Sequence, residues 1–181
     1  MAKLKLFSVS DHYINYLMKF ERRVYSNKEN ERTHTRKYLG TVLEINGFKY
    51  FVPLSSPKDS DYFDREKREI RKSTVPIIRM VSQSISGELE LKGTLKFSNM
   101  IPVPECSLQV YDLNAETDPD YKILVTKELE YINSNSERVI KNAEVIYKQK
   151  TQNRIEIGYI NNTVDFRLLE EKCKEYIPAE E

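Results

Sequence analysis

The dipeptide Asn46-Gly47 constrains the fold most, because it stands between two runs of strand-forming residues in "YLGTVLEINGFKYFVPL". Both residue types tolerate a positive φ, which a two-residue turn between antiparallel strands requires. Apolar residues then recur at positions 48, 50, 52 and 54 of the second run. This alternation predicts a strand with one buried face.

Antiparallel pairing also predicts which distant residues meet. The start of the first strand, at Arg36 and Lys37, should lie beside the end of the second, at Ser55 and Ser56. The polar segment 27–37 before the hairpin therefore brings its cations toward two hydroxyls. The side chains expected to gather there are Arg32, His34, Arg36, Lys37, Ser55, Ser56 and Lys58.

Periodicity predicts the other elements of the chain. Strands are expected over residues 3–10, 75–81, 87–103 and 107–113, and helices over residues 11–25, 118–135, 134–150 and 164–178. The charged stretch 59–73 is expected to be a mobile loop or a short solvated helix. The predicted fold is α+β, with one domain over residues 1–181 in which about four helices pack around an antiparallel sheet.

Capping residues and apolar stripes predict where these helices begin and end and which side of each is buried. Ser10 or Asp11 would cap the first, Ser134 and Glu137 would form a capping box for the third, and Pro178 would end the last. The buried side of the second helix is expected to hold Ile123, Leu124, Leu129 and Ile132.

Charge is distributed unevenly along the chain, although the formal net charge is only +1. Residues 1–100 hold 19 Lys and Arg against 12 Asp and Glu, whereas residues 101–181 hold 10 against 16. Such an excess of cations in one half suggests contact with nucleic acid. A chance distribution over a solvated surface is the alternative.

Several functional classes are excluded by what the chain lacks. No run approaches the roughly 18 apolar residues of a membrane helix, and the first residues turn polar too early for a signal peptide, so we expect a cytoplasmic protein without membrane contact. Cys106 and Cys173 match no metal or disulfide spacing, and no metal or other cofactor is expected. The GxxxxGK[ST], GxGxxG, HExxH and GxSxG motifs of common enzymes are absent.

The hydroxyls and cations at the end of the hairpin suit an RNA phosphate, since both groups donate hydrogen bonds to phosphate oxygens. RNA carries its own nucleophile. Its 2′-hydroxyl can attack the adjacent phosphate when a base accepts its proton, an acid protonates the leaving 5′-oxygen and cations stabilise the developing charge. Such a reaction requires no metal.

Each of these features also has a plainer interpretation. The "PLSSP" sequence is typical of an ordinary turn, and a histidine in a polar loop, such as His34, is often only exposed. The cations that follow the hairpin are interleaved with acids, so they could form a solvated face instead of binding RNA. They are Arg65, Lys67, Arg68, Arg71 and Lys72.

Five blocks of the chain resemble one known family. They are "KLFSVSDHYINYLMKF", "KYLGTVLEINGFKYFVPLSSPK", "GTLKFSNMIPV", "YKILVTKELEYINSNSERVIKNAEVIY" and "DFRLLEEKCKEY". Their content and order resemble the ToxN/AbiQ endoribonucleases, the toxins of bacterial type III toxin-antitoxin systems. The similarity covers nearly the whole chain, and "LGTVLEINGFKYFVPLSSPK" is its most specific block.

The resemblance implies a strongly twisted antiparallel sheet with surrounding helices, similar to the MazF/Kid toxin fold. It implies cleavage of RNA without a metal, often at adenine-rich sites, to a 2′,3′-cyclic phosphate and a 5′-hydroxyl. The implied partner is a repeated antitoxin RNA folded into pseudoknots, which the toxin processes and which inhibits it in a closed toxin-RNA assembly. Cellular or phage RNA would be the substrate, and abortion of phage infection the role.

The family's groove contains a hydroxyl pair followed by proline and lysine, which matches Ser55, Ser56, Pro57 and Lys58. By this resemblance Ser56 would hold or polarise the reacting phosphate and ribose, and Lys58 would stabilise the phosphorane.

The loop before the hairpin departs from the family pattern. Where members can carry a tyrosine and a lysine, this chain has Arg32 and Arg36. Arginine does not deprotonate, so His34 is the first candidate for proton transfer and Lys58 the second.

These arguments together predict a metal-independent endoribonuclease toxin. The predicted catalytic residues are Ser55, Ser56, Lys58, Arg36 and His34, and the predicted RNA-binding residues are Arg32, Lys37, Arg65, Lys67, Arg68, Arg71 and Lys72. A non-catalytic RNA-binding module is one alternative, and it would leave RNA intact. A protein interaction domain whose oppositely charged halves associate head to tail is another, and salt would abolish that association.

Overall fold

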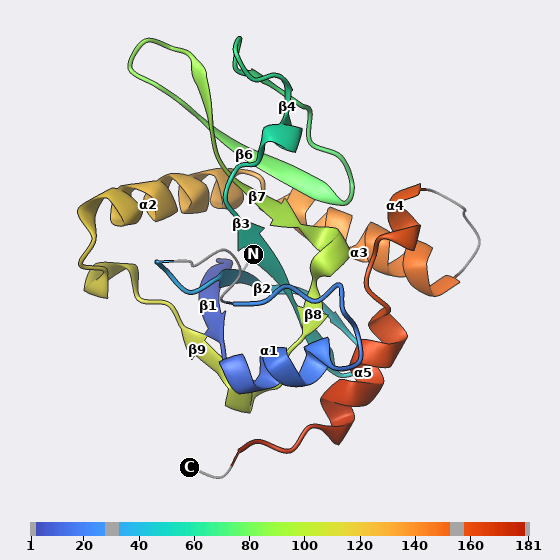
Figure 1. The fold of residues 1–181 in the computed structure, drawn as a ribbon. Coiled ribbons are helices and arrows are strands. Elements are labelled where there is room, and N and C mark those ends of the chain that lie inside the picture. Colours follow the sequence, from blue (N-terminus) through green and yellow to red (C-terminus); the bar gives the residue numbers. More distant parts are fainter. Residues whose placement is uncertain (1–2, 28–32, 153–157, 180–181) are drawn as a thin grey trace.

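The computed structural model describes residues 3–27, 33–152 and 158–179. Figure 1 shows its strands, which are β1 (Lys5–Val9), β2 (Lys37–Ile45), β3 (Phe48–Ser55), β4 (Tyr62–Asp64), β5 (Glu69–Ile70), β6 (Ile77–Gln83), β7 (Leu89–Lys96), β8 (Ile101–Pro102) and β9 (Leu108–Val110). The helices are α1 (Asp11–Met18), α2 (Pro119–Ser134), α3 (Ser136–Gln152), α4 (Gly158–Asn161) and α5 (Phe166–Glu175). None of the helices described has the length and apolar character needed to cross a membrane.

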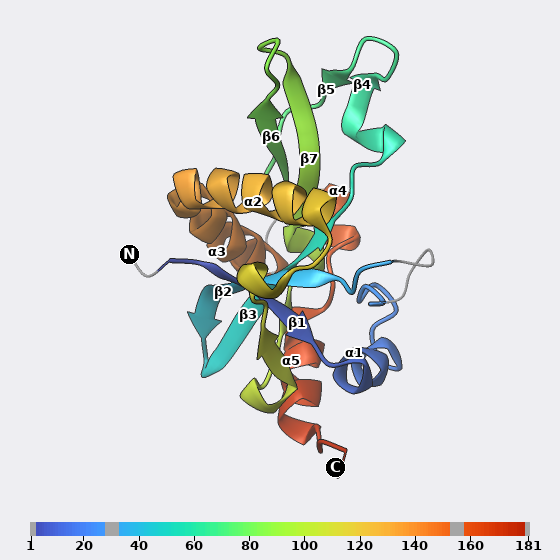
Figure 2. The same ribbon diagram turned by 90° about the vertical axis from the view of Figure 1, so that its left-hand side faces the viewer.

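A seven-stranded antiparallel sheet forms the centre of the molecule, in the order β6-β7-β3-β2-β1-β9 with β8 also paired to β3. The central strand β3 changes partner along its length, since Phe51 pairs with β8 and Leu54 pairs with β7. Figure 2 shows the resulting twist, because β6 and β7 rise steeply while β2 and β3 run obliquely below them. The predicted combination of an antiparallel sheet and packed helices is confirmed.

The hairpin predicted at Asn46-Gly47 is confirmed. The two residues have φ angles of 53° and 79°, as a two-residue turn with both positions in the left-handed region requires. Tyr38 of β2 lies opposite Pro53 of β3. The start of β2 and the end of β3 therefore meet at one end of the sheet.

The prediction that the second strand has only one buried face is wrong. Phe51 and Pro53 are buried, as is Tyr50 on the opposite face. The Tyr50 hydroxyl donates to Glu170 of α5, whereas the Phe51 ring meets the edge of Phe7 from β1, with ring centroids 5.3 Å apart. Because β3 lies in the middle of a twisted sheet, other parts of the chain cover both of its faces.

The first helix is shorter than predicted, although Ser10 caps it as expected. It ends at Met18, well before the predicted residue 25. Beyond it, the buried carboxylate of Glu21 accepts hydrogen bonds from the backbone nitrogens of Arg23 and Asp165. These bonds turn the chain toward α5 instead of continuing the helix.

Two other helix boundaries also differ from the prediction. Ser134 is the last residue of α2 and its hydroxyl donates to the carbonyl oxygen of Glu130, so the capping box with Glu137 is wrong. The last helix ends at Glu175 and not at Pro178. Tyr176 is already extended, with ψ 126°, and Pro178 disfavours helical backbone only at the next residue, Ile177.

The buried stripe of α2 differs from the predicted one. Its buried residues are Val125, Glu128 and Ile132, whereas Ile123 is 61% exposed. The helix packs on β6 and β7, and this contact decides which side faces inward. As a result, a glutamate lies within the buried stripe.

We predict that Gly40→Ala destabilises the protein. A Cβ at position 40 would collide with the ring of Phe51, which is 1% exposed. Overpacking of this kind should lower the free energy of unfolding by about 1–3 kcal/mol, measurable by urea unfolding. Gly158→Ala is the matched control, because among the described residues no atom outside its own local backbone lies within 4 Å of its Cβ position. Equal stability of the two variants would contradict this description of the core.

Candidate active site

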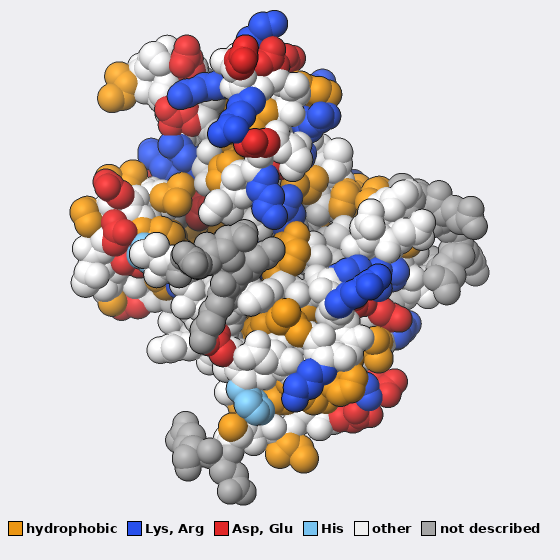
Figure 3. Space-filling view, viewed as in Figure 1, with side chains coloured by type: hydrophobic (Ala, Val, Ile, Leu, Met, Phe, Trp, Pro, Cys, Tyr) orange, Lys and Arg blue, Asp and Glu red, His pale blue; other side chains and the backbone are white. Residues whose placement is uncertain are grey.

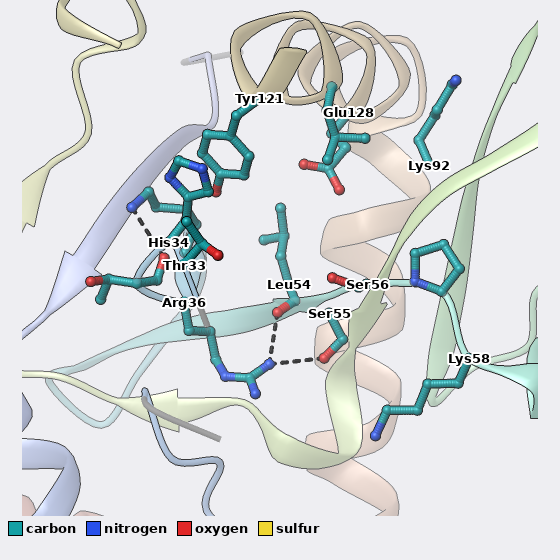
Figure 4. Close-up of a pocket in the computed structure, with 14 residues that line it drawn as sticks. Thr33, His34, Arg36, Leu54, Ser55, Ser56, Lys58, Lys92, Tyr121 and Glu128 are labelled. Atoms are coloured by element: carbon teal, nitrogen blue, oxygen red, sulfur yellow. Dashed lines mark hydrogen bonds between the residues drawn. The ribbon is translucent and has the colours of Figure 1, made fainter. Parts of the chain in front are cut away.

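The meeting point of β2 and β3 opens into a cleft of about 480 Å³. Its walls are residues 33–37 before and at the start of β2, residues 54–58 at the end of β3, Lys92 of β7, and Tyr121, Leu124 and Glu128 of α2. Figure 4 shows these side chains converging from separate parts of the chain. The predicted meeting of the basic loop with the two serines is confirmed.

Arg36 and Ser55 form the floor of this cleft. The Arg36 Nη1 donates to the carbonyl oxygen of Leu54 at 2.8 Å and to Ser55 Oγ at 2.9 Å. Its Nε donates to the carbonyl oxygen of Ser26, and only 3% of the residue is exposed. This geometry favours a positioning role for Arg36, which ties the end of β3 to the start of β2.

Ser56 and Lys58, by contrast, are exposed side chains at the rim of the cleft. Hydroxyl and ammonium groups in such a position can donate hydrogen bonds to a phosphate that enters. The structure therefore separates four of the five predicted catalytic residues into a buried pair that builds the site and two residues that face an incoming ligand.

A buried ion pair that the sequence did not predict anchors the loop of Lys58. Asp61 is 1% exposed, and it accepts hydrogen bonds from the Lys58 backbone nitrogen at 2.9 Å and from Arg79 Nε at 3.0 Å. The segment predicted as a mobile loop or solvated helix instead forms a 3₁₀ turn followed by the β4–β5 hairpin. That part of the prediction is wrong, because the buried pair and the hairpin pairing order the segment.

His34 is docked against α2, so the alternative of a simply exposed histidine is wrong. Its ring stacks on Tyr121 with centroids 3.7 Å apart, and its Nε2 lies 3.1 Å from Oδ2 of Asp118. The backbone hydrogen bond from Tyr121, and then the bond with His34, lower the pKa of Asp118. An ionised carboxylate can only accept, so Nε2 carries the hydrogen and Nδ1 of the neutral ring can receive a proton.

Lys37 lines the same cleft with a partly buried ammonium group. Its Nζ lies 4.7 Å from the ring centroid of Tyr111 and donates to the carbonyl oxygen of Thr35. Burial lowers the pKa of Lys37, and the charge of Glu116 opposes this shift. Arg32, the other predicted cation of this loop, lies outside the described residues.

A second cleft of about 400 Å³ adjoins the first. The two clefts share Pro57, Lys58 and Lys92. Arg65 and Arg68, two of the predicted RNA-binding cations, line the second cleft. A ligand that occupies the first cleft could therefore extend past Lys58 onto these arginines.

The other predicted cations of this run line neither of these two clefts. Lys67 pairs with Asp64, Arg71 lies 4.2 Å from the ring centroid of Phe63, and the Lys72 carbonyl accepts from Arg79. Figure 3 shows Lys and Arg side chains over the hairpins at the top of the view, with acidic groups among them. For these three residues the solvated-face alternative stays open.

Three ionisable residues of the cleft wall were missed by the sequence reasoning, namely Lys92, Glu128 and the Tyr121 on which His34 stacks. The Lys92 Nζ pairs with Glu90 at 2.6 Å. Glu128 is 7% exposed, and burial raises its pKa to about 8. Its position three residues after Val125 and four before Ile132 could have identified it, because that spacing places it on the same helix face.

Comparisons of the chain with known proteins agree on one family. The family described as "Toxin ToxN, type III toxin-antitoxin system" matches residues 5–174. The chain is 35% identical to the endoribonuclease AbiQ of Lactococcus lactis subsp. lactis over 173 residues, which cover 96% of this chain and 89% of that protein. It is 27% identical to the endoribonuclease ToxN of Pectobacterium atrosepticum, with 96% and 94% covered.

Solved structures share the fold over almost the whole chain. One comes from work on selective toxin inhibition by a non-coding RNA pseudoknot in type III systems, with a TM-score of 0.78, 30% identity, and coverage of 96% of this chain and 98% of that one. Another is AbiQ, a lactococcal anti-phage endoribonuclease, with a TM-score of 0.76, 32% identity, and coverage of 97% and 98%.

We predict that Asp61→Ala destabilises the protein strongly. The substitution leaves Arg79 without its buried partner, and loss of one member of such a pair should lower the free energy of unfolding by about 3–5 kcal/mol. Asp59→Ala is the control, because Asp59 pairs with Arg65 at the exposed surface. Its loss should lower the free energy of unfolding by less than about 1 kcal/mol. Comparable losses for both variants in urea unfolding would refute the anchoring role.

We also predict a pH dependence of stability that comes from Glu128. In the unfolded chain its carboxyl ionises with a pKa of about 4.3. In the folded chain burial raises its pKa to about 8, so the carboxyl keeps its proton up to that pH. Between these values the folded state holds the extra proton, so this contribution to the free energy of unfolding falls as pH rises. Glu128→Gln should lack that decline when urea unfolding is compared at about pH 5 and pH 8, and parallel curves for the two proteins would count against a buried neutral carboxyl.

Proposed function

We propose that this chain, which belongs to the ToxN family of type III toxin-antitoxin toxins, is an endoribonuclease toxin that cleaves RNA in the cleft at the end of the β2–β3 hairpin. The observation that carries the proposal is the exposed pair Ser56 and Lys58 above the floor that Arg36 and Ser55 form. The relatives AbiQ and ToxN are named endoribonucleases, which supports the same activity here.

The proposed reaction uses the 2′-hydroxyl of RNA as its nucleophile and yields a 2′,3′-cyclic phosphate and a 5′-hydroxyl, without a metal. His34 is the candidate base, because Asp118 orients its ring and leaves Nδ1 to accept the 2′ proton. Ser56 would hydrogen-bond the phosphate, and Lys58 would stabilise the charge that develops on it. Adenine-rich sites are the expected targets, and the likeness to the MazF/Kid fold stays a prediction.

The two adjoining clefts offer a path for more than one nucleotide. Lys58 and Lys92 belong to both, and Arg65 and Arg68 extend the positive lining beyond the reaction site. Cations placed along such a path bind the RNA backbone irrespective of sequence, so affinity should fall steeply with salt.

We propose that the same clefts bind a repeated antitoxin RNA folded into pseudoknots. A solved relative is associated with inhibition by an RNA pseudoknot, and another with regulation of a bacterial antiviral system by a processed non-coding RNA. By analogy this chain would process its antitoxin, be inhibited by it in a closed toxin-RNA assembly in the cytoplasm, and act against phage by cleaving cellular or phage RNA.

The second candidate function is a non-catalytic RNA-binding module. It is favoured by one observation, that Arg36 and Ser55 bond each other and are 3% and 6% exposed, although both were predicted to be catalytic. Such a module would use both clefts and leave RNA intact.

The test is to incubate the purified protein with total bacterial RNA in EDTA and to map the new ends. We expect 2′,3′-cyclic phosphate ends, and a loss of cleavage rate of about 100-fold or more for Ser56→Ala and for Lys58→Ala, the size of effect that removal of one stabilising donor produces. Lys174→Ala, which changes an exposed cation of α5 outside both clefts, is the control and should cut normally. Intact RNA that co-purifies with the protein would favour the binding module.

A further inference from the structure

The carboxyl of Glu128 has no partner, although most of the side chain is buried. The residue is 7% exposed, and no hydrogen bond or ion pair joins its side chain to any part of the chain that the structure describes. Figure 4 shows the carboxyl pointing from α2 into the cleft above Ser55 and Ser56. A carboxyl that is largely removed from water without a partner costs free energy, and its opening onto the cleft makes it available to a ligand.

Gly93 of β7 provides the space that the carboxyl occupies. A Cβ at position 93 would collide with Oε1 of Glu128 and would lie 3.2 Å from the carbonyl oxygen of Ser55. The carboxyl therefore lies against Gly93 of β7, next to the end of β3, where Ser55 pairs with Thr94. Any other residue at position 93 would displace it.

Glu128 is a neutral acid at neutral pH, because burial raises its pKa to about 8. The ionisable groups that line the same cleft are His34, Arg36, Lys37, Lys58, Lys92 and Tyr121, and none of them contributes to that shift. An RNA phosphate that enters would favour the neutral form further, since a nearby negative charge disfavours the carboxylate. The group can thus face RNA without repelling it.

We propose that Glu128 is the general acid of this cleft and protonates the 5′-oxygen of the leaving nucleotide. The inference rests on the proposed endoribonuclease function and supplies its missing proton donor. The 2′-oxygen forms a bond to phosphorus while its proton passes to Nδ1 of His34. The bond from phosphorus to the 5′-oxygen breaks, its electron pair stays on that oxygen, and the oxygen takes the proton of Glu128. Exchange with water then returns a proton to Glu128 and removes one from His34.

His34 and Glu128 are suitably separate for these two roles. His34 precedes β2 and is held by Asp118, whereas Glu128 lies on α2 next to β7. An in-line displacement needs its base and its acid at different sides of the phosphorus, because the attacking and leaving oxygens are opposed. The two groups line one cleft from different elements.

The test compares an RNA that has an ordinary 5′-oxygen at a mapped cleavage site with one that has sulfur in that bridging position. A thiolate leaves without a proton, since thiols ionise near about 8.5. We expect Glu128→Gln to slow single-turnover cleavage of the oxygen substrate by about 100- to 10,000-fold, and to cut the sulfur substrate at close to the rate of the unaltered protein. Ser56→Ala is the matched control and should slow both substrates.

Gly93→Ala provides a second variant, because it displaces the carboxyl without removing it. It should show the same selective loss on the oxygen substrate. With the unaltered protein, kcat/KM for the oxygen substrate should fall as pH rises above about 8, because kcat/KM reports the acid of the free protein, whereas kcat/KM for the sulfur substrate should not.

Two results would overturn the assignment. If Glu128→Gln cuts the oxygen substrate at the normal rate, or slows both substrates equally, Glu128 is not the acid, and an equal loss would point to contact with the RNA instead. If the unaltered protein cuts neither substrate, the proposed function fails and the assignment fails with it. Cleavage by the unaltered protein thus distinguishes an error in the acid from an error in the function.

Discussion

The antiparallel pairing of β2 with β3 is the constraint on which the rest of the structure depends. The turn at Asn46 and Gly47 pairs Ile45 with Phe48, and a register shift between Leu39 and Leu43 then places Tyr38 opposite Pro53. This register brings Arg36 to the end of β3, where its guanidinium bonds the Leu54 carbonyl and the Ser55 hydroxyl. A contact between residues far apart in the chain therefore builds the cleft floor, and Ser56 and Lys58 leave the sheet at its rim.

The electrostatic character of the cleft follows from what is buried beneath it and beside it. The charges of Arg36 and of the Asp61–Arg79 pair lie inside the protein, where their hydrogen bonds hold the neighbouring loops in place. Lys58 and Lys92 line the cleft, the latter paired with Glu90, and Glu128 lines the same cleft as a neutral acid. The site thus combines donors for an anion with a proton source, and Glu128 is the one carboxyl among the described residues that line the first cleft.

Local sequence signals were sufficient to predict the hairpin, the approach of Arg36 to Ser55, and the antiparallel sheet with its helices. They could not predict that β3 is buried on both faces, because this depends on α5 and β1, which are distant in the chain. The end of α1 was missed for a similar reason, since Glu21 is held by Asp165. Near the site, Asp61 and Glu128 were missed, because acidic residues are usually exposed to solvent and a local pattern does not show which of them the fold buries.

The central claim is that RNA reacts at the end of the β2–β3 hairpin. The most direct measurement is a crystal structure of the protein bound to a short RNA whose 2′-oxygens are methylated, which blocks attack. The account predicts a phosphate within hydrogen-bond distance of Ser56 and Lys58, with its 5′-oxygen facing Glu128 and the next nucleotide near Arg65 and Arg68. RNA bound elsewhere on the surface, with this cleft empty, would contradict it.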